Sequence, residues 1–120
     1  MPGRRAERLA EQIKEEVSLI IAGEVEDPRV VFVTVTDAKL SADLRNAKIY
    51  VSVVGTEAEI KGSLDALRHA GGFIRHQLGA VLRMKHTPEL RFVYDDADLR
   101  AARIEELLSE EVEKVPEPER

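Results

Sequence analysis

The sequence predicts a single α+β domain whose elements follow the order helix, strand, strand, helix, kink, helix, strand. Apolar residues recur every three or four positions in two long segments, and strand-like runs occupy three shorter ones. The second helical segment is interrupted by a pair of adjacent glycines. A chain of 120 residues, 43% of them hydrophobic, is long enough to bury one core and too short for two. We therefore expect one compact domain to carry the function.

The first segment has the period of a helix with one buried face, and we place this helix at residues 4–24. Its apolar residues are spaced by three and four: Leu9, Ile13, Val17, Ile20 and Ile21. Gly23 marks its end together with Asp27 and Pro28, because proline blocks further helix and favours an extended conformation at the residue before it.

Two strands follow, and we expect them to pair as a hairpin. Residues 30–36 are β-branched or aromatic almost throughout, which is typical of a strand. A polar stretch over residues 37–43 is expected to interrupt the pattern. The second strand then has one more apolar face, formed by Ala47, Ile49, Val51 and Val53.

Thr56 and Glu59 form a capping-box pattern that predicts the start of a second helix. Its helical spacing stops at Ala70, Gly71 and Gly72, where two adjacent glycines cost about 1 kcal/mol each relative to alanine inside a helix. The spacing then resumes, so we expect two helical pieces joined by a kink or a tight turn.

Pro88 ends this helical region, and the alternation of residues 90–94 predicts a third strand. Residues 104–112 have the pattern of one or two amphipathic helical turns, and residues 116–119 are expected to be disordered. We therefore place the domain at residues 1–95 and an acidic tail, partly helical and partly disordered, at residues 96–120.

The net charge of -5 is unevenly spread. Residues 61–91 carry six basic and two acidic side chains, whereas residues 95–120 carry ten acidic and four basic ones. A charge acts within about 10 Å at ordinary salt, so the local surplus matters more than the total. The surplus at residues 61–91 favours an anionic partner such as RNA.

The sequence lacks the residues that several classes of protein require. The chain has no cysteine, its longest run without a charge has eight residues, and its basic start leads into further charged residues. We therefore expect a cytoplasmic protein without a membrane partner.

Catalysis and cofactor binding also find little support. No carboxylate follows His69 or His76 at metal-site spacing, and we expect these histidines and His86 to lie on the surface. Lys61 precedes Gly62, which reverses the order found in a phosphate-binding loop. The acidic residues that open the tail are assigned to solubility. We expect no enzyme activity, no cofactor and no metal.

Four groups of residues stand out by their order and spacing: Asp27-Pro28-Arg29; Leu40-Ser41-Ala42-Asp43-Leu44 leading into Ala47-Lys48-Ile49-Tyr50-Val51-Ser52; Ala70-Gly71-Gly72-Phe73-Ile74-Arg75 with Leu78-Gly79; and Pro88-Glu89-Leu90 before Phe92. Together they resemble the ribosome-binding factor A family over nearly the whole chain. The resemblance implies a type II KH-like domain, with a three-stranded sheet covered by helices on one face. It also implies that Ala70-Gly71-Gly72 is the AxG kink that replaces the GxxG loop of ordinary KH domains.

The resemblance further implies a function. Proteins of this family bind free small (30S) ribosomal subunits during late maturation and help to process 16S rRNA. The implied partners are the 30S subunit and its 16S rRNA. Nothing in the sequence suggests an obligate dimer, so we expect a monomer.

Candidate RNA contacts gather around the kink, because arginine and lysine neutralise phosphates and glycine lets another backbone approach. Those near the kink and in the strand after it are Arg68, Ala70, Gly71, Gly72, Arg75, Arg83, Lys85 and Arg91. Further candidates are Arg4, Arg5 and Arg8 in the first helix, and Lys39, Arg45 and Lys48 around the hairpin.

Each group of candidates has a structural alternative. The cations near the kink also suit the solvated face of an amphipathic helix, and the first three arginines also suit a frayed helix terminus. The two glycines would also let two helices pack. Most of the five aromatic residues are expected in the core, which leaves shape and phosphates as the basis of recognition.

The leading interpretation is therefore a non-enzymatic factor that binds rRNA. One alternative is a general KH-type RNA-binding module, or a protein-interaction module whose acidic tail mimics nucleic acid, with no ribosomal role. Another is a small enzyme on the same framework, for which the sequence offers no catalytic triad, dyad or metal set.

Overall fold

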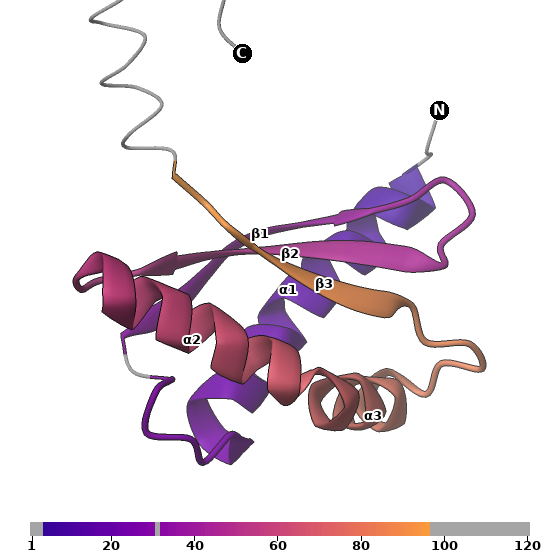
Figure 1. The fold of residues 1–120 in the computed structure, drawn as a ribbon. Helices are drawn as coiled ribbons and strands as arrows, with labels where there is room; N and C mark the ends of the chain where they lie inside the picture. The colour runs from indigo at the N-terminus through magenta and orange to yellow at the C-terminus, as the bar shows by residue number, and fades with distance from the viewer. Residues whose placement is uncertain (1–3, 31, 97–120) are drawn as a thin grey trace, which may run out of the picture.

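The computed structural model describes residues 4–30 and 32–96, and its elements follow the predicted order (Figure 1). They are α1 (Arg4–Glu24), β1 (Val33–Leu40), β2 (Asn46–Val53), α2 (Glu57–His69), α3 (Gly71–Leu82) and β3 (Glu89–Tyr94). The predicted acidic tail, apart from its first residue, lies outside the described residues.

The strands form one sheet in the order β1-β2-β3. β1 and β2 pair in the antiparallel direction, which confirms the predicted hairpin, and β3 lies parallel to β2 at the edge. A parallel neighbour needs a long crossover that returns the chain to the same end of the sheet. The helices α2 and α3 provide this crossover, and their junction is thereby held beside β3.

The core lies between one face of the sheet and the helices. Ile49 and Phe92 from the strands pack in one cluster with Ile13 of α1, Leu67 of α2 and Ile74 of α3, and each is at most 2% exposed. Alternate residues of a strand point to opposite faces, and those that alternate with the core positions include the exposed Lys39, Lys48 and Arg91. No helix of the described part of the chain covers that face (Figure 1). This confirms the predicted cover on one face.

The position of β1 differs from the prediction at both ends. The strand begins only at Val33, because Phe32 has a left-handed backbone with a φ of 57°. It continues to Leu40, through residues whose polarity predicts a loop. A bulge after Val35 shifts the alternation by one residue, so that Ala38, only 7% exposed, faces the core. Because residues 37–43 are mostly polar, the sequence pattern does not predict that the strand continues into them.

The break in the second helical segment falls at Ala70. This residue ends α2 and precedes α3, with a φ of -85° and a ψ of 3°, and its amide donates to the Ala66 carbonyl at 2.9 Å. The predicted capping box also forms: the Thr56 side chain accepts from the Glu59 amide, and the Glu59 carboxylate accepts from the Thr56 amide. Both the kink and the helix start are confirmed.

The prediction that most aromatic residues lie in the core is wrong. Phe92 is 2% exposed, but Phe32 and Phe73 are 73% and 44% exposed, and Tyr50 and Tyr94 are half-buried. The reason is that aliphatic side chains from α1, α2 and α3 fill most of the layer behind the sheet. All three histidines are exposed, as predicted.

Candidate nucleic-acid interface

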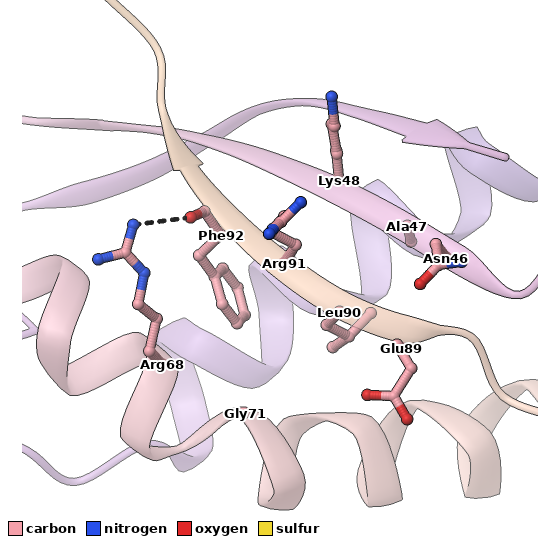
Figure 2. Close-up of a pocket in the computed structure, with 9 residues that line it drawn as sticks. All are labelled: Asn46, Ala47, Lys48, Arg68, Gly71, Glu89, Leu90, Arg91 and Phe92. Atoms are coloured by element: carbon pink, nitrogen blue, oxygen red, sulfur yellow. Dashed lines mark hydrogen bonds between the residues drawn. The ribbon is translucent and has the colours of Figure 1, made fainter.

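A groove runs between the edge of β3 and the junction of α2 and α3 (Figure 2). The strand β3 and the start of β2 form one wall, and the end of α2 with the start of α3 forms the other. The groove is lined by Asn46, Ala47, Lys48, Arg68, Gly71, Glu89, Leu90, Arg91 and Phe92. Four of the predicted RNA contacts therefore lie together: Lys48, Arg68, Gly71 and Arg91.

Arg68 lies near the end of α2 and faces the edge of the sheet. One guanidinium nitrogen donates to the Phe92 carbonyl oxygen at 3.2 Å, and another lies 3.9 Å from the Asp65 carboxylate. The side chain is 55% exposed, so its charge stays open to a ligand in the groove. The fork of donors on a guanidinium matches the oxygens of a phosphate group.

Gly71 and Gly72 open α3, although the fold requires glycine at neither position. Neither residue has a positive φ, and a Cβ atom built on either meets no atom of the described residues within 4 Å. The interpretation that these glycines serve helix packing is therefore wrong. Glycine lacks a Cβ atom and lets another backbone approach closely, so the open space at these two positions suits the approach of another molecule.

Arg75 has structural partners that the sequence does not reveal. Its guanidinium donates to the Thr87 carbonyl at 2.7 and 3.2 Å and to the Pro88 carbonyl at 3.1 Å, and it lies 3.7 Å from the Glu89 carboxylate. These contacts hold α3 against the segment that enters β3. The RNA contact predicted for Arg75 stays a prediction, because packing within the chain already explains this arginine.

Arg83 and Lys85 lie beyond the other end of α3. Arg83 ends the helix in the left-handed conformation, with a φ of 54° and a ψ of 43°, and both side chains are exposed. Lys85 lines a second hollow, which also contains Gly72 and His76. Arg75 lines the same hollow, so three of the predicted RNA contacts, Gly72, Arg75 and Lys85, lie together there, whereas Arg68 lines the groove beside β3.

Four further candidate arginines lie at the start of α1 and in the hairpin turn. Arg4, Arg5 and Arg8 are exposed and line shallow hollows of their own. Arg45 is exposed between β1 and β2, where its carbonyl accepts the Glu89 amide at 2.8 Å. The described lining of the groove beside β3 includes none of these four arginines. Their contact with RNA stays a prediction.

Lys39, Lys48 and Arg91 occupy one row across the sheet. Lys39 is directly opposite Lys48 in the strand register, and Lys48 is directly opposite Arg91. All three are exposed, on the face without helices. The sequence identifies them one by one but not as a row, because the pairing of β2 with β3 joins residues that are far apart along the chain.

No sequence pattern points to Asn46, Leu90 or the Phe92 carbonyl as parts of the groove. The alternation of residues 90–94 predicts which side chains share a face of the strand. It does not predict which strand is the neighbour or which helix end lies beside the edge. These residues become visible as groove residues only once the sheet order is known.

The described residues bring together no set of groups for metal binding. They contain no cluster of three or more histidine and acidic side chains that could hold a metal ion. Two carboxyls with lowered pKa values lie in turns. Donation from the Arg29 side chain and amide lowers the pKa of Asp27, and donation from the Ser41 hydroxyl and the Arg45 amide lowers the pKa of Asp43.

No helix in the described part of the chain is both long enough and apolar enough to cross a membrane.

Solved structures confirm the fold. The crystal structure of ribosome-binding factor A from Thermus thermophilus matches with a TM-score of 0.67 at 30% identity, covering 74% of this chain and 94% of that one. A homology model of the Thermus thermophilus factor, fitted into a cryo-EM map of a 30S complex, matches with a TM-score of 0.62 at 31% identity and covers 72% of this chain and 91% of that one. The fold is therefore KH-like.

Sequence comparison agrees with the structural match. The family model described as Ribosome-binding factor A matches residues 5–108. The ribosome-binding factor A of Desulfitobacterium hafniense strain DCB-2 is 47% identical over 108 residues, which make up 90% of this chain and 86% of that relative. The chain belongs to the ribosome-binding factor A family.

Proposed function

We propose that this protein binds the small (30S) ribosomal subunit through its 16S rRNA, and that it assists late maturation of the subunit and processing of the rRNA. Membership of the ribosome-binding factor A family supports a ribosomal partner. The relative fitted into the map of a 30S complex supports the small subunit. The proposed role is binding without catalysis, by a monomer in the cytoplasm.

The open space at Gly71 and Gly72 is the observation that carries this proposal. A Cβ atom on either glycine would meet no described atom within 4 Å. Gly71 lines the same groove as the 55% exposed side chain of Arg68, and Gly72 lines the neighbouring hollow that contains Arg75. Ala70 precedes α3 without a side-chain hydrogen bond to the first amides of the helix. Free amides at a helix start attract anions, so a phosphate group at this bend would meet amides and an arginine together.

A binding factor of this kind can act on maturation through differences in affinity. A protein that binds one conformation of an immature particle more tightly than another increases the population of the first. Phosphate contacts supply affinity that does not depend on sequence, and the shape of the folded rRNA supplies selectivity. Neither step needs a reacting group.

The test compares substitutions at two glycines that both have open space around an added Cβ atom but lie at different positions on the surface. Gly72→Leu fills the space at the start of α3, and Gly23→Leu is the matched control, because a Cβ atom on Gly23 also meets no described atom within 4 Å. Both variants should keep the circular dichroism spectrum of the native protein. In density gradients of cell extract, the native chain and Gly23→Leu should travel with free 30S subunits, and Gly72→Leu should not.

Two results would contradict the proposal in different ways. If folded Gly72→Leu still travels with 30S subunits, the bend is not the contact. If the native chain is missing from the 30S fractions under conditions in which immature subunits accumulate, a general RNA-binding or protein-interaction module without a ribosomal role replaces the proposed function.

A further inference from the structure

Three cations stand side by side on the face of the sheet that carries no helix. The register places Lys39, Lys48 and Arg91 directly opposite one another on three successive strands. Neighbouring strands lie about 4.8 Å apart, so the row extends over about 10 Å. In Figure 2 the side chains of Lys48 and Arg91 lie on the side of the strands away from Gly71, whereas Leu90 points toward the helices.

This arrangement is unfavourable for the fold taken alone. Like charges directly opposite each other on neighbouring strands destabilise a sheet. Within residues 4–30 and 32–96, none of the three cations forms an ion pair with an acidic side chain. The described contact of Lys39 is with the ring of Tyr50, whose centroid lies 5.8 Å from the ammonium nitrogen.

Three acidic side chains on the strands and the turn that carry the row have other described contacts. Glu89, on the same strand as Arg91, lies 3.7 Å from the Arg75 guanidinium on α3. Asp37, on the same strand as Lys39, accepts from the Ala38 amide at 2.8 Å. Asp43 in the hairpin turn accepts from the Ser41 hydroxyl at 2.6 Å. No described ion pair therefore neutralises a member of the row directly.

The row is continuous with the groove. Lys48 and Arg91 belong to both, because they lie where the groove opens around the edge of β3. Lys39 does not line the groove and lies on β1, at the far side of β2. A polyanion that leaves the groove across β3 would therefore meet Arg91, Lys48 and Lys39 in that order.

We propose that the helix-free face of the sheet is a second part of the RNA-binding surface, on which the phosphates that follow those in the groove lie along Arg91, Lys48 and Lys39. This inference rests on the proposed function and extends it from the α2–α3 junction to the opposite face of the domain. The ligand is the sugar-phosphate backbone, because the row offers evenly spaced charge and the aromatic ring beside it, that of Tyr50, is half-buried and already in contact with Lys39.

Lys39 provides the decisive test, because it belongs to the row and not to the groove. The variant is Lys39→Gln, and the charge-preserving variant is Lys39→Arg. The control is Lys14→Gln, since Lys14 lies on α1, which covers the other face of the sheet. Removing Lys39 relieves like-charge repulsion, so the melting temperature should stay unchanged or rise.

The measurement is the affinity of the full chain for purified 30S subunits between about 50 and 200 mM KCl. One lost phosphate contact lowers the slope of log K against log salt by about 0.7 to 0.9. Lys39→Gln should show this loss, whereas Lys39→Arg and Lys14→Gln should keep the native slope. The Gly72→Leu variant is measured in parallel.

The outcomes separate this inference from the proposed function. If the native protein binds, Gly72→Leu binds weakly and Lys39→Gln matches Lys14→Gln, the extended surface is excluded and the proposed contact at the bend between α2 and α3 is retained. If the native protein itself does not bind 30S subunits, the proposed function fails and the extended surface fails with it.

Discussion

The guanidinium of Arg68 donates a hydrogen bond of 3.2 Å to the carbonyl oxygen of Phe92, and thereby joins the end of α2 to the outer edge of β3. Phe92 is buried, whereas the Arg68 side chain is 55% exposed. Arg68 thus stabilises the groove through one guanidinium nitrogen, and the exposed part of its guanidinium can bind an anionic ligand. These two roles can be separated by substitution.

Arg68→Lys keeps the positive charge but not the fork of donors. We expect a loss of about 0.5 to 1.5 kcal/mol in the free energy of unfolding, which is the usual net value of one hydrogen bond. Arg68→Gln should lose a similar amount and also the charge. Urea unfolding measures the first effect. The salt dependence of 30S binding measures the second and should change in Arg68→Gln more than in Arg68→Lys.

Gly71→Ala and Gly72→Ala should stabilise the protein while weakening its binding. Each replacement raises helix propensity, and the added methyl group meets no described atom within 4 Å. The free energy of unfolding should rise by about 0.5 to 1 kcal/mol for each, measured by thermal or urea unfolding. Affinity for 30S subunits should fall, because the methyl group keeps a phosphate away from the helix start. A stabilised variant with unchanged affinity for 30S subunits would show that the two glycines do not contact the subunit.

Gly79 is the opposite case, a glycine that the fold does require. A Cβ atom at this position would overlap the hydroxyl oxygen of Thr87, in the segment that leads from α3 to β3. Gly79→Ala should therefore cost about 1 to 3 kcal/mol in the free energy of unfolding. The double variant with Thr87→Ala should recover most of that loss, because the overlapping atom is gone. Equal losses in the single and double variants would show that Thr87 is not the cause.

Local patterns in the sequence predict the helices, the capping box at Thr56 and the break at Ala70. Each of these depends on residues within one or two turns. The extent of β1 is not predicted, because the bulge after Val35 moves a polar stretch into the strand while keeping Ala38 in the core. The prediction that most aromatic residues are buried is wrong for a related reason, because composition does not say which apolar side chains fill the layer behind the sheet.

The candidate interface is predictable only in part. The glycine pair and Arg68 stand close together in the chain, so the sequence identifies them together. The inward partners of Arg75 and the row of Lys39, Lys48 and Arg91 depend on contacts between distant segments. A single sequence supplies the residues of such a site but not their register.

The turn before β1 provides a pH-dependent prediction. Donation from the Arg29 side chain and amide holds the pKa of Asp27 below its ordinary value of 3.8. A carboxyl with a lowered folded-state pKa stabilises the fold above its unfolded-state pKa, and this contribution is lost as the pH falls through the lowered value. In an NMR titration of the side-chain carboxyl groups, Asp27 should titrate below 3.8 in the native chain and closer to 3.8 in Arg29→Gln. Asp43, whose pKa is lowered by Ser41 and Arg45, is the internal control and should titrate identically in both proteins. If the titration midpoint of Asp27 is the same in the native chain and in Arg29→Gln, the ion pair between Asp27 and Arg29 does not persist in solution.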